Sequence, residues 1–107
     1  MKVEYTGRQT TITAKLRTQA EAGLARIAKV VDRSASAHVI LSEDKYRKIA
    51  EVTIMCRHGE LVATCESTEM ETALHDALQK VEHQAIRNKE RFDTVTRHAK
   101  PVMSEAI

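Results

Sequence analysis

The sequence predicts an α+β domain with the order β-α-β-β-β-α, in which a four-stranded mixed sheet carries two helices packed on one face. Three observations lead to this fold. Two segments carry apolar residues at helical spacing, four shorter segments alternate apolar and polar residues, and a His58-Gly59 pair separates the last two of these. The chain of 107 residues has the size of one domain, and its low aromatic content predicts an aliphatic core.

The first half of the chain predicts a βαβ unit. Residues 1–7 alternate as a short strand does, and a helix is predicted from residue 14 to about residue 31, with Thr11 or Thr13 as its N-cap. The inward stripe of this helix comprises Leu16, Ala20, Leu24, Ile27 and Val31. A second strand at 37–41 would then run parallel to the first, because the crossover is a helix.

The second half predicts a hairpin. Residues 42–48 form a charged loop, 49–57 the third strand and 60–66 the fourth, with His58-Gly59 as a two-residue turn. The predicted pairs are Arg57 with Glu60, Cys56 with Leu61, Ile54 with Ala63 and Val52 with Cys65. In this register the six apolar partners share one face, as a helix-covered sheet requires.

A second amphipathic helix is predicted over residues 67–92. Its apolar stripe comprises Met70, Ala73, Leu74, Ala77, Leu78, Val81 and Ala85. Lys80, Arg87 and Arg91 fall within roughly 40° of one another on a flank of this stripe. The domain is therefore predicted to span residues 1–92, followed by a flexible C-terminal tail at 93–107.

Charge is segregated along the chain. Residues 1–33 carry a net charge of +4, residues 34–79 carry −4, and residues 80–107 carry +2. On the first helix, Lys15, Arg26 and Lys29 fall on one outward face. This distribution fits a positive binding face, and it also fits a mixed solvated surface; the charge count leaves both open.

Chemistry that would mark an enzyme is missing from the pattern. Cys56 and Cys65 are predicted as small buried hydrophobes without a disulfide, and their spacing with His58 is too irregular for zinc. No nucleophile stands beside a base, and the three glycines are too far apart to cradle a phosphate. We therefore expect a non-enzymatic protein with no catalytic residue, metal, cofactor or small-molecule substrate.

The remaining feature is cationic. Lys and Arg at helical spacing neutralise phosphates, while the scarcity of aromatic residues argues against stacking on unpaired bases. Recognition of folded RNA by shape and charge fits this pattern. The alternative is a protein-interaction regulatory module that uses the uncovered sheet face, to which Ile40, Met55 and Val62 are predicted to point. No apolar run reaches membrane-spanning length, so no membrane partner is expected and the cytoplasm is the expected location.

Several segments resemble a known family in their order along the chain. They are Val3-Glu4-Tyr5-Thr6-Gly7-Arg8, Ile12-Thr13, His38-Val39-Ile40-Leu41-Ser42, Gly59-Glu60-Leu61-Val62-Ala63 and, on the second helix, Met70, Ala73, Lys80, Glu82 and Gln84. From about Lys2 to Arg91 the chain resembles the bacterial ribosome hibernation-promoting factor and ribosome-associated inhibitor family, also called sigma-factor modulation proteins. Glu71, His75, Gln79 and His83 depart from the family pattern. The three-strand portion followed by a helix is also similar to the double-stranded-RNA-binding domain.

The resemblance implies a translation inhibitor that silences idle ribosomes. It implies binding to the 16S-type rRNA of the small ribosomal subunit, in the channel used by mRNA and by A- and P-site tRNA. The expected rRNA-binding residues are Lys80, Arg87, Lys89 and Arg91, together with Lys15, Arg26 and Lys29 from the first helix. The chain resembles a short member, which acts with a separate ribosome-dimerising factor or as a subunit-blocking inhibitor; a piece of a long member is the other option. The alternative module would work without ribosome binding.

Overall fold

The structure is a computed structural model that describes residues 1–31, 35–57 and 59–98, with side chains described as far as Lys89. Its elements are β1 (Lys2–Arg8), α1 (Ala14–Ala28), β2 (Ser36–Asp44), β3 (Arg47–Cys56), β4 (Gly59–Ser67) and α2 (Met70–His98). This order confirms the predicted β-α-β-β-β-α fold.

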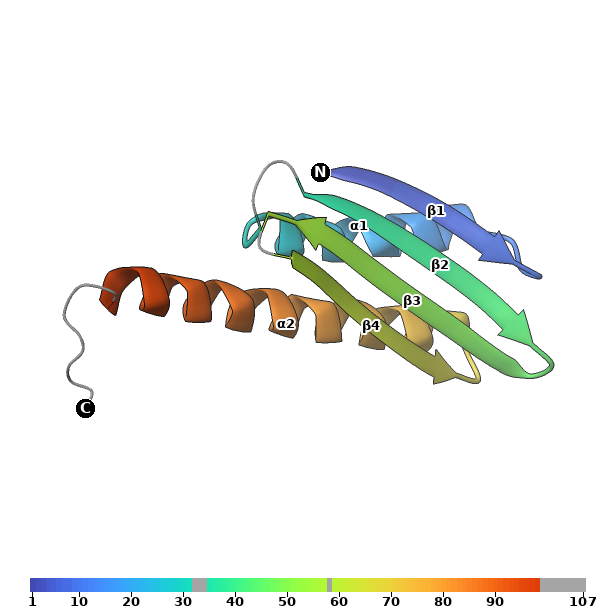
Figure 1. The fold of residues 1–107 in the computed structure, drawn as a ribbon. Coiled ribbons are helices and arrows are strands. Elements are labelled where there is room, and N and C mark those ends of the chain that lie inside the picture. The colour runs from blue at the N-terminus through green and yellow to red at the C-terminus, as the bar shows by residue number, and fades with distance from the viewer. Residues whose placement is uncertain (32–34, 58, 99–107) are drawn as a thin grey trace.

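The four strands form one mixed sheet in the order β1-β2-β3-β4. β1 runs parallel to β2, and the other two neighbouring pairs are antiparallel. Both helices lie on the same face of this sheet, and the other face has no helix over it (Figure 1). α2 packs over β3 and β4 and also against α1. The sheet and the two helices thus form two layers around one core.

The predicted apolar stripes form that core. Every predicted stripe residue of α2 is buried except Met70, which is partly buried. The predicted stripe residues within α1 are all buried, and Val31, which lies beyond the end of α1, is partly buried. The hydroxyl of Thr13 accepts a hydrogen bond from the Leu16 backbone N–H at 3.2 Å, which makes Thr13 the N-cap of α1. Between the helices, a β-carbon at Gly23 would lie 2.8 Å from Leu78 Cδ1, so glycine permits the close approach of α1 and α2.

The predicted register of the last hairpin is wrong by two residues. Cys56 pairs with Gly59, Ile54 with Leu61, Val52 with Ala63 and Ala50 with Cys65. Gly59 is therefore the first residue of β4 rather than part of the turn. Because side chains alternate with a period of two, a shift of two keeps every apolar residue on its predicted face. Ala50, Val52, Ile54, Leu61 and Ala63 are accordingly buried.

The predicted charged loop at 42–48 is also wrong. β2 continues to Asp44 and β3 begins at Arg47, so only Lys45 and Tyr46 connect them. Lys45 takes a φ of 61°, in the left-handed region that a tight hairpin turn requires. The charged residues remain in the strands because they pair across them, Asp44 with Arg47 and Glu43 with Lys48.

The helix ends differ from the prediction. α1 ends at Ala28, three residues before the predicted end, with Lys29 as its C-cap. α2 continues to His98, six residues beyond the predicted boundary at residue 92. Residues 93–96 (Asp-Thr-Val-Thr) have low helix propensity, so the extension follows from propagation of the long helix before them rather than from their own preference. Of the predicted tail, residues 99–107 lie outside the described residues, and its flexibility stays a prediction.

Candidate nucleic-acid interface

Two of the predicted cations lie where α2 meets the edge of the sheet. Lys80 lines a hollow of about 350 Å³ together with residues of β4, among them Cys65. About two turns further along the helix, Arg87 lines a second hollow with Leu61 and Gln84. Both side chains are exposed and belong to the flank of α2 that faces β4. The structure therefore places Lys80 and Arg87 on one flank of α2, as predicted.

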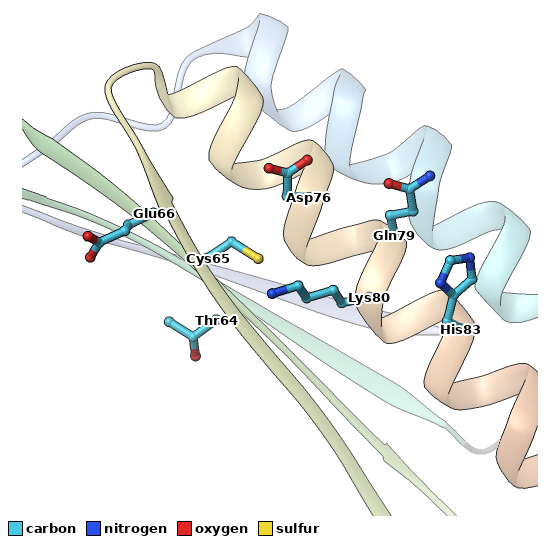
Figure 2. A pocket seen from close by; sticks show the side chains of 7 residues that line it. All are labelled: Thr64, Cys65, Glu66, Asp76, Gln79, Lys80 and His83. Carbon is cyan, nitrogen blue, oxygen red and sulfur yellow. The ribbon is translucent and has the colours of Figure 1, made fainter.

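Figure 2 shows how the first hollow is built. Lys80 extends from α2 toward β4, and Cys65 points from β4 toward the helix. Thr64 and Glu66, its neighbours on the strand, point away from the helix, as the alternation of a strand requires. A cationic side chain thus spans the groove between the helix and the edge strand.

One hydrogen bond fixes this groove. Gln84 Nε2 donates to the backbone carbonyl of Val62 at 2.9 Å, joining α2 directly to β4. Gln84 lies between Lys80 and Arg87 along the helix, so this bond holds the helix flank at a set position on the edge strand. The two cations are consequently presented by a fixed surface rather than by a loop.

Acidic residues are unevenly placed along this flank. Asp76 and Glu66 line the hollow that contains Lys80, whereas none of the described side chains that line the hollow with Arg87 is a carboxylate. Glu82 lies between the two cations in sequence, but it faces α1 and pairs with Arg26. In the part of the chain with described side chains, no carboxylate forms an ion pair with Lys80 or Arg87. Among the described side chains, the carboxylates of this flank therefore lie at the Lys80 end rather than at Arg87.

The cations predicted on α1 have a different setting. Lys15 Nζ lies 2.9 Å from Glu71 Oε2, and Arg26 Nε lies 3.5 Å from Glu82 Oε1. Both pairs cross the seam between the two helices. Lys29 is exposed at the C-terminal end of α1. The structure thus separates the predicted cations into an α2 group that faces β4 and an α1 group that largely faces α2.

Sequence reasoning missed Glu71 and Glu82 as partners of the α1 cations. A signal was present, since Lys15 and Arg26 are eleven residues apart and so are Glu71 and Glu82. Eleven residues are close to three full turns, so each pair of like charges recurs on one helix face about 16 Å apart. Two parallel helices with matching charge spacing can form both pairs at once. The last predicted cations, Lys89 and Arg91, lie on α2, where Lys89 is exposed and the Arg91 side chain lies outside the described residues.

On its other flank, α1 meets β1 through Arg17, whose guanidinium carbon lies 4.8 Å from the centre of the Tyr5 ring. The Tyr5 hydroxyl is buried and has no hydrogen-bond partner among the described residues. Burial raises the pKa of Tyr5 above its ordinary value of 10.0, the charge of Glu21 raises it further, and Arg17 lowers it. This tyrosine reports on the packing of β1 under α1.

We expect Tyr5 to ionise at a higher pH in the folded protein than in the unfolded protein. The measurement is the phenolate absorbance of the Tyr46→Phe variant, which leaves Tyr5 as the only tyrosine, in buffer and in urea. Because folding raises the pKa of Tyr5, its titration does not change the stability of the fold below pH 10. The free energy of unfolding falls as pH rises through the folded pKa. Equal midpoints in buffer and in urea would contradict the buried environment.

The described residues include two cysteines, Cys56 and Cys65, which are both free thiols. Both are only partly buried, whereas the sequence predicted buried hydrophobes. Among the side chains that the structure describes, which end at Lys89, no group of three or more His, Cys, Asp or Glu residues is placed to hold a metal ion. Within the same residues no helix is both long and apolar enough to cross a membrane.

Comparison with known families and proteins gives consistent matches across the chain. A family model described as "Sigma 54 modulation protein / S30EA ribosomal protein" matches residues 3–93. A ribosome hibernation promoting factor of Azotobacter vinelandii is 31% identical over 91 residues, which cover 85% of each chain. The protein of the same name from Escherichia coli is 26% identical over 92 residues, covering 86% of this chain and 97% of that one.

Solved structures show the same fold. The N-terminal domain of Thermus thermophilus Protein Y superposes with a TM-score of 0.76 at 27% identity, covering 82% of this chain and 99% of that domain. A ribosomal subunit interface protein from Coxiella burnetii superposes with a TM-score of 0.73 at 23% identity, covering 84% of this chain and 99% of its own. The mixed four-stranded sheet with two helices on one face is therefore shared with these proteins.

Proposed function

The chain belongs to the sigma 54 modulation protein / S30EA ribosomal protein family, and on that basis we propose that it is a ribosome hibernation factor. It acts in the cytoplasm as a non-enzymatic inhibitor of translation. It binds the 16S-type rRNA of the small ribosomal subunit, in the channel that mRNA and the A- and P-site tRNAs use. Its presence there keeps an idle ribosome silent.

The observation that carries this proposal is the cationic flank of α2 along β4. Lys80 and Arg87 lie outside the core, are exposed and have no carboxylate partner among the described side chains. Backbone phosphates are the ligands that such lysines and arginines contact in folded RNA. The two cations lie along the groove between α2 and β4, whose geometry is fixed. This arrangement suits a partner that itself has a fixed shape.

The proposed rRNA contacts fall into two groups. Lys80 and Arg87 are the central contacts, and Lys89 and Arg91 extend them toward the end of α2. Lys15, Arg26 and Lys29 of α1 form the second group, of which two members are paired with α2 carboxylates. The α2 group is expected to contribute most of the salt-dependent affinity, because releasing a paired cation costs the interaction with its carboxylate.

Co-sedimentation with purified small subunits tests the proposed function. We expect association at low salt that weakens as salt rises, since each phosphate contact adds about 0.7–0.9 to the slope of log affinity against log salt. Subunits whose channel is already filled with mRNA and P-site tRNA should bind less protein. Absence of association at low salt would contradict ribosome binding, and equal binding to filled subunits would contradict the position in the channel.

A regulatory protein-interaction module is the second candidate. Met55 is 51% exposed and Val62 is 39% exposed, both on the sheet face that no helix covers. Met55 also lines a hollow on this face together with Lys2, Glu4 and His38. A stoichiometric protein partner recovered from ribosome-depleted lysate, and lost in a Met55→Ser/Val62→Ser variant, would favour this candidate over rRNA binding.

A further inference from the structure

The seam between α1 and α2 carries two ion pairs, Lys15 with Glu71 and Arg26 with Glu82, which we call the seam pairs. Their N–O distances are 2.9 Å and 3.5 Å. The helices run in parallel. Lys15, near the start of α1, therefore meets Glu71, near the start of α2, and Arg26 meets Glu82 further along both helices. Two of the three cations predicted for RNA binding on α1 are thereby matched with an internal anion.

Packing of the two helices sets the geometry of the seam pairs. Gly23 lies against Leu78 in the seam, between the two pairs. Gln19 Nε2 donates to the backbone carbonyl of Glu71 at 2.8 Å, which holds the start of α2 beside α1. These contacts fix the distance between the helices, so each carboxylate stays within reach of its cation.

The seam pairs contribute little to folding. The side chains of Lys15 and Glu71 are 77% and 48% exposed, and those of Arg26 and Glu82 are 56% and 24% exposed. Exposed pairs of this kind stabilise a fold weakly because water and salt screen them. Their main effect is therefore on the electrostatic potential of the surface, where each carboxylate cancels one positive charge on the α1 side.

We propose that Glu71 and Glu82 determine which face of the domain binds RNA, by acting as internal counter-anions that withhold Lys15 and Arg26 from phosphates. This inference rests on the proposed function, because it concerns the same RNA partner. The β4-facing flank of α2 then carries most of the productive contacts, and Lys15 and Arg26 contribute little. A phosphate that approaches Lys15 or Arg26 meets the negative charge of a carboxylate 2.9 Å or 3.5 Å from the cation.

Neutral variants of the two carboxylates test this inference. We expect the Glu71→Gln/Glu82→Gln protein to elute from a heparin column at higher salt than the wild type. On small subunits, each freed cation should steepen the salt dependence by about 0.7–0.9, which corresponds to about fivefold tighter binding per cation at 0.1 M salt. The matched control is Glu4→Gln/Glu60→Gln, which changes net charge equally at exposed positions on the open sheet face.

The increase in RNA affinity must also depend on the two withheld cations, Lys15 and Arg26. In a Lys15→Ala/Arg26→Ala background, the same two glutamine substitutions should add no more than the control does. A gain equal to that of the control, or a gain that survives the removal of both cations, would overturn the inference. If the wild type fails to bind subunits, the proposed function falls, while heparin elution still decides whether the two carboxylates withhold the cations.

Discussion

Replacing Lys80 and Arg87 with glutamate is expected to weaken binding to small subunits by about a hundredfold at 0.1 M salt. Each substitution removes a phosphate contact and places a negative charge against the RNA backbone. Both residues are exposed and lie off the apolar stripe of α2, so the free energy of unfolding should change by less than about 0.5 kcal/mol. Salt titrations of subunit co-sedimentation measure the binding, and urea denaturation measures the stability.

The matched control for this variant is Lys2→Glu/Lys45→Glu, which changes net charge by the same amount. Lys2 lies on the open sheet face and Lys45 in the β2–β3 turn, both exposed and away from α2. We expect this control to retain at least a third of the wild-type affinity, the remaining loss being long-range repulsion. An equal loss in both variants would mean that binding follows total charge and that no particular flank contacts the RNA.

Truncation of Leu74 to alanine is expected to have the largest effect on stability. Leu74 is fully buried in α2, where the helix packs over β3 and β4. Removing its isobutyl group takes away buried apolar surface and leaves a cavity, which together cost about 2–5 kcal/mol. For a small domain this is a large part of the total stability. Thermal and urea denaturation should both register the loss.

Ile86→Ala is the control for this truncation. Ile86 belongs to the same helix but is 37% exposed, so its removal creates no enclosed cavity. We expect a loss of less than about 1 kcal/mol. A Leu74→Ala protein as stable as the Ile86→Ala protein would show that α2 is not the helix that closes the core. Since Lys80 and Arg87 are carried by α2, such a result would also undermine the fixed geometry of the groove.

The sequence was sufficient for the fold and for the face that each strand buries, but not for strand register. A two-residue turn at His58-Gly59 satisfies the apolar pattern, and so does the observed register with Cys56 opposite Gly59. The pattern has a period of two and cannot distinguish registers that differ by two. The charged composition of residues 42–48 also led to a wrong prediction at the β2–β3 connection. Charged residues there resembled a loop, although they pair across neighbouring strands.

The placement of Lys80 and Arg87 on one flank of α2 was predicted, whereas the setting of the α1 cations was not; the RNA-binding role of both groups stays a prediction. Periodicity within α2 placed Lys80 and Arg87 on a common flank, because that relation depends on a single helix. The environment of Lys15 and Arg26 depends on how two helices are aligned, which is set by the contact of Gly23 with Leu78. No pattern within α1 contains this information. The matching intervals of eleven residues suggest a pairing only once the helices are known to be parallel neighbours.

The hydrogen bond from Gln84 to Val62 also bears on self-association. β4 is the last strand of the sheet, and an edge strand can recruit a strand from another molecule through its unpaired backbone groups. The Val62 carbonyl, one acceptor on this strand, is already satisfied by a side chain of its own helix. An incoming strand would have to compete with that bond for the Val62 carbonyl. Gln84 therefore leaves β4 with one backbone acceptor fewer to offer a second molecule.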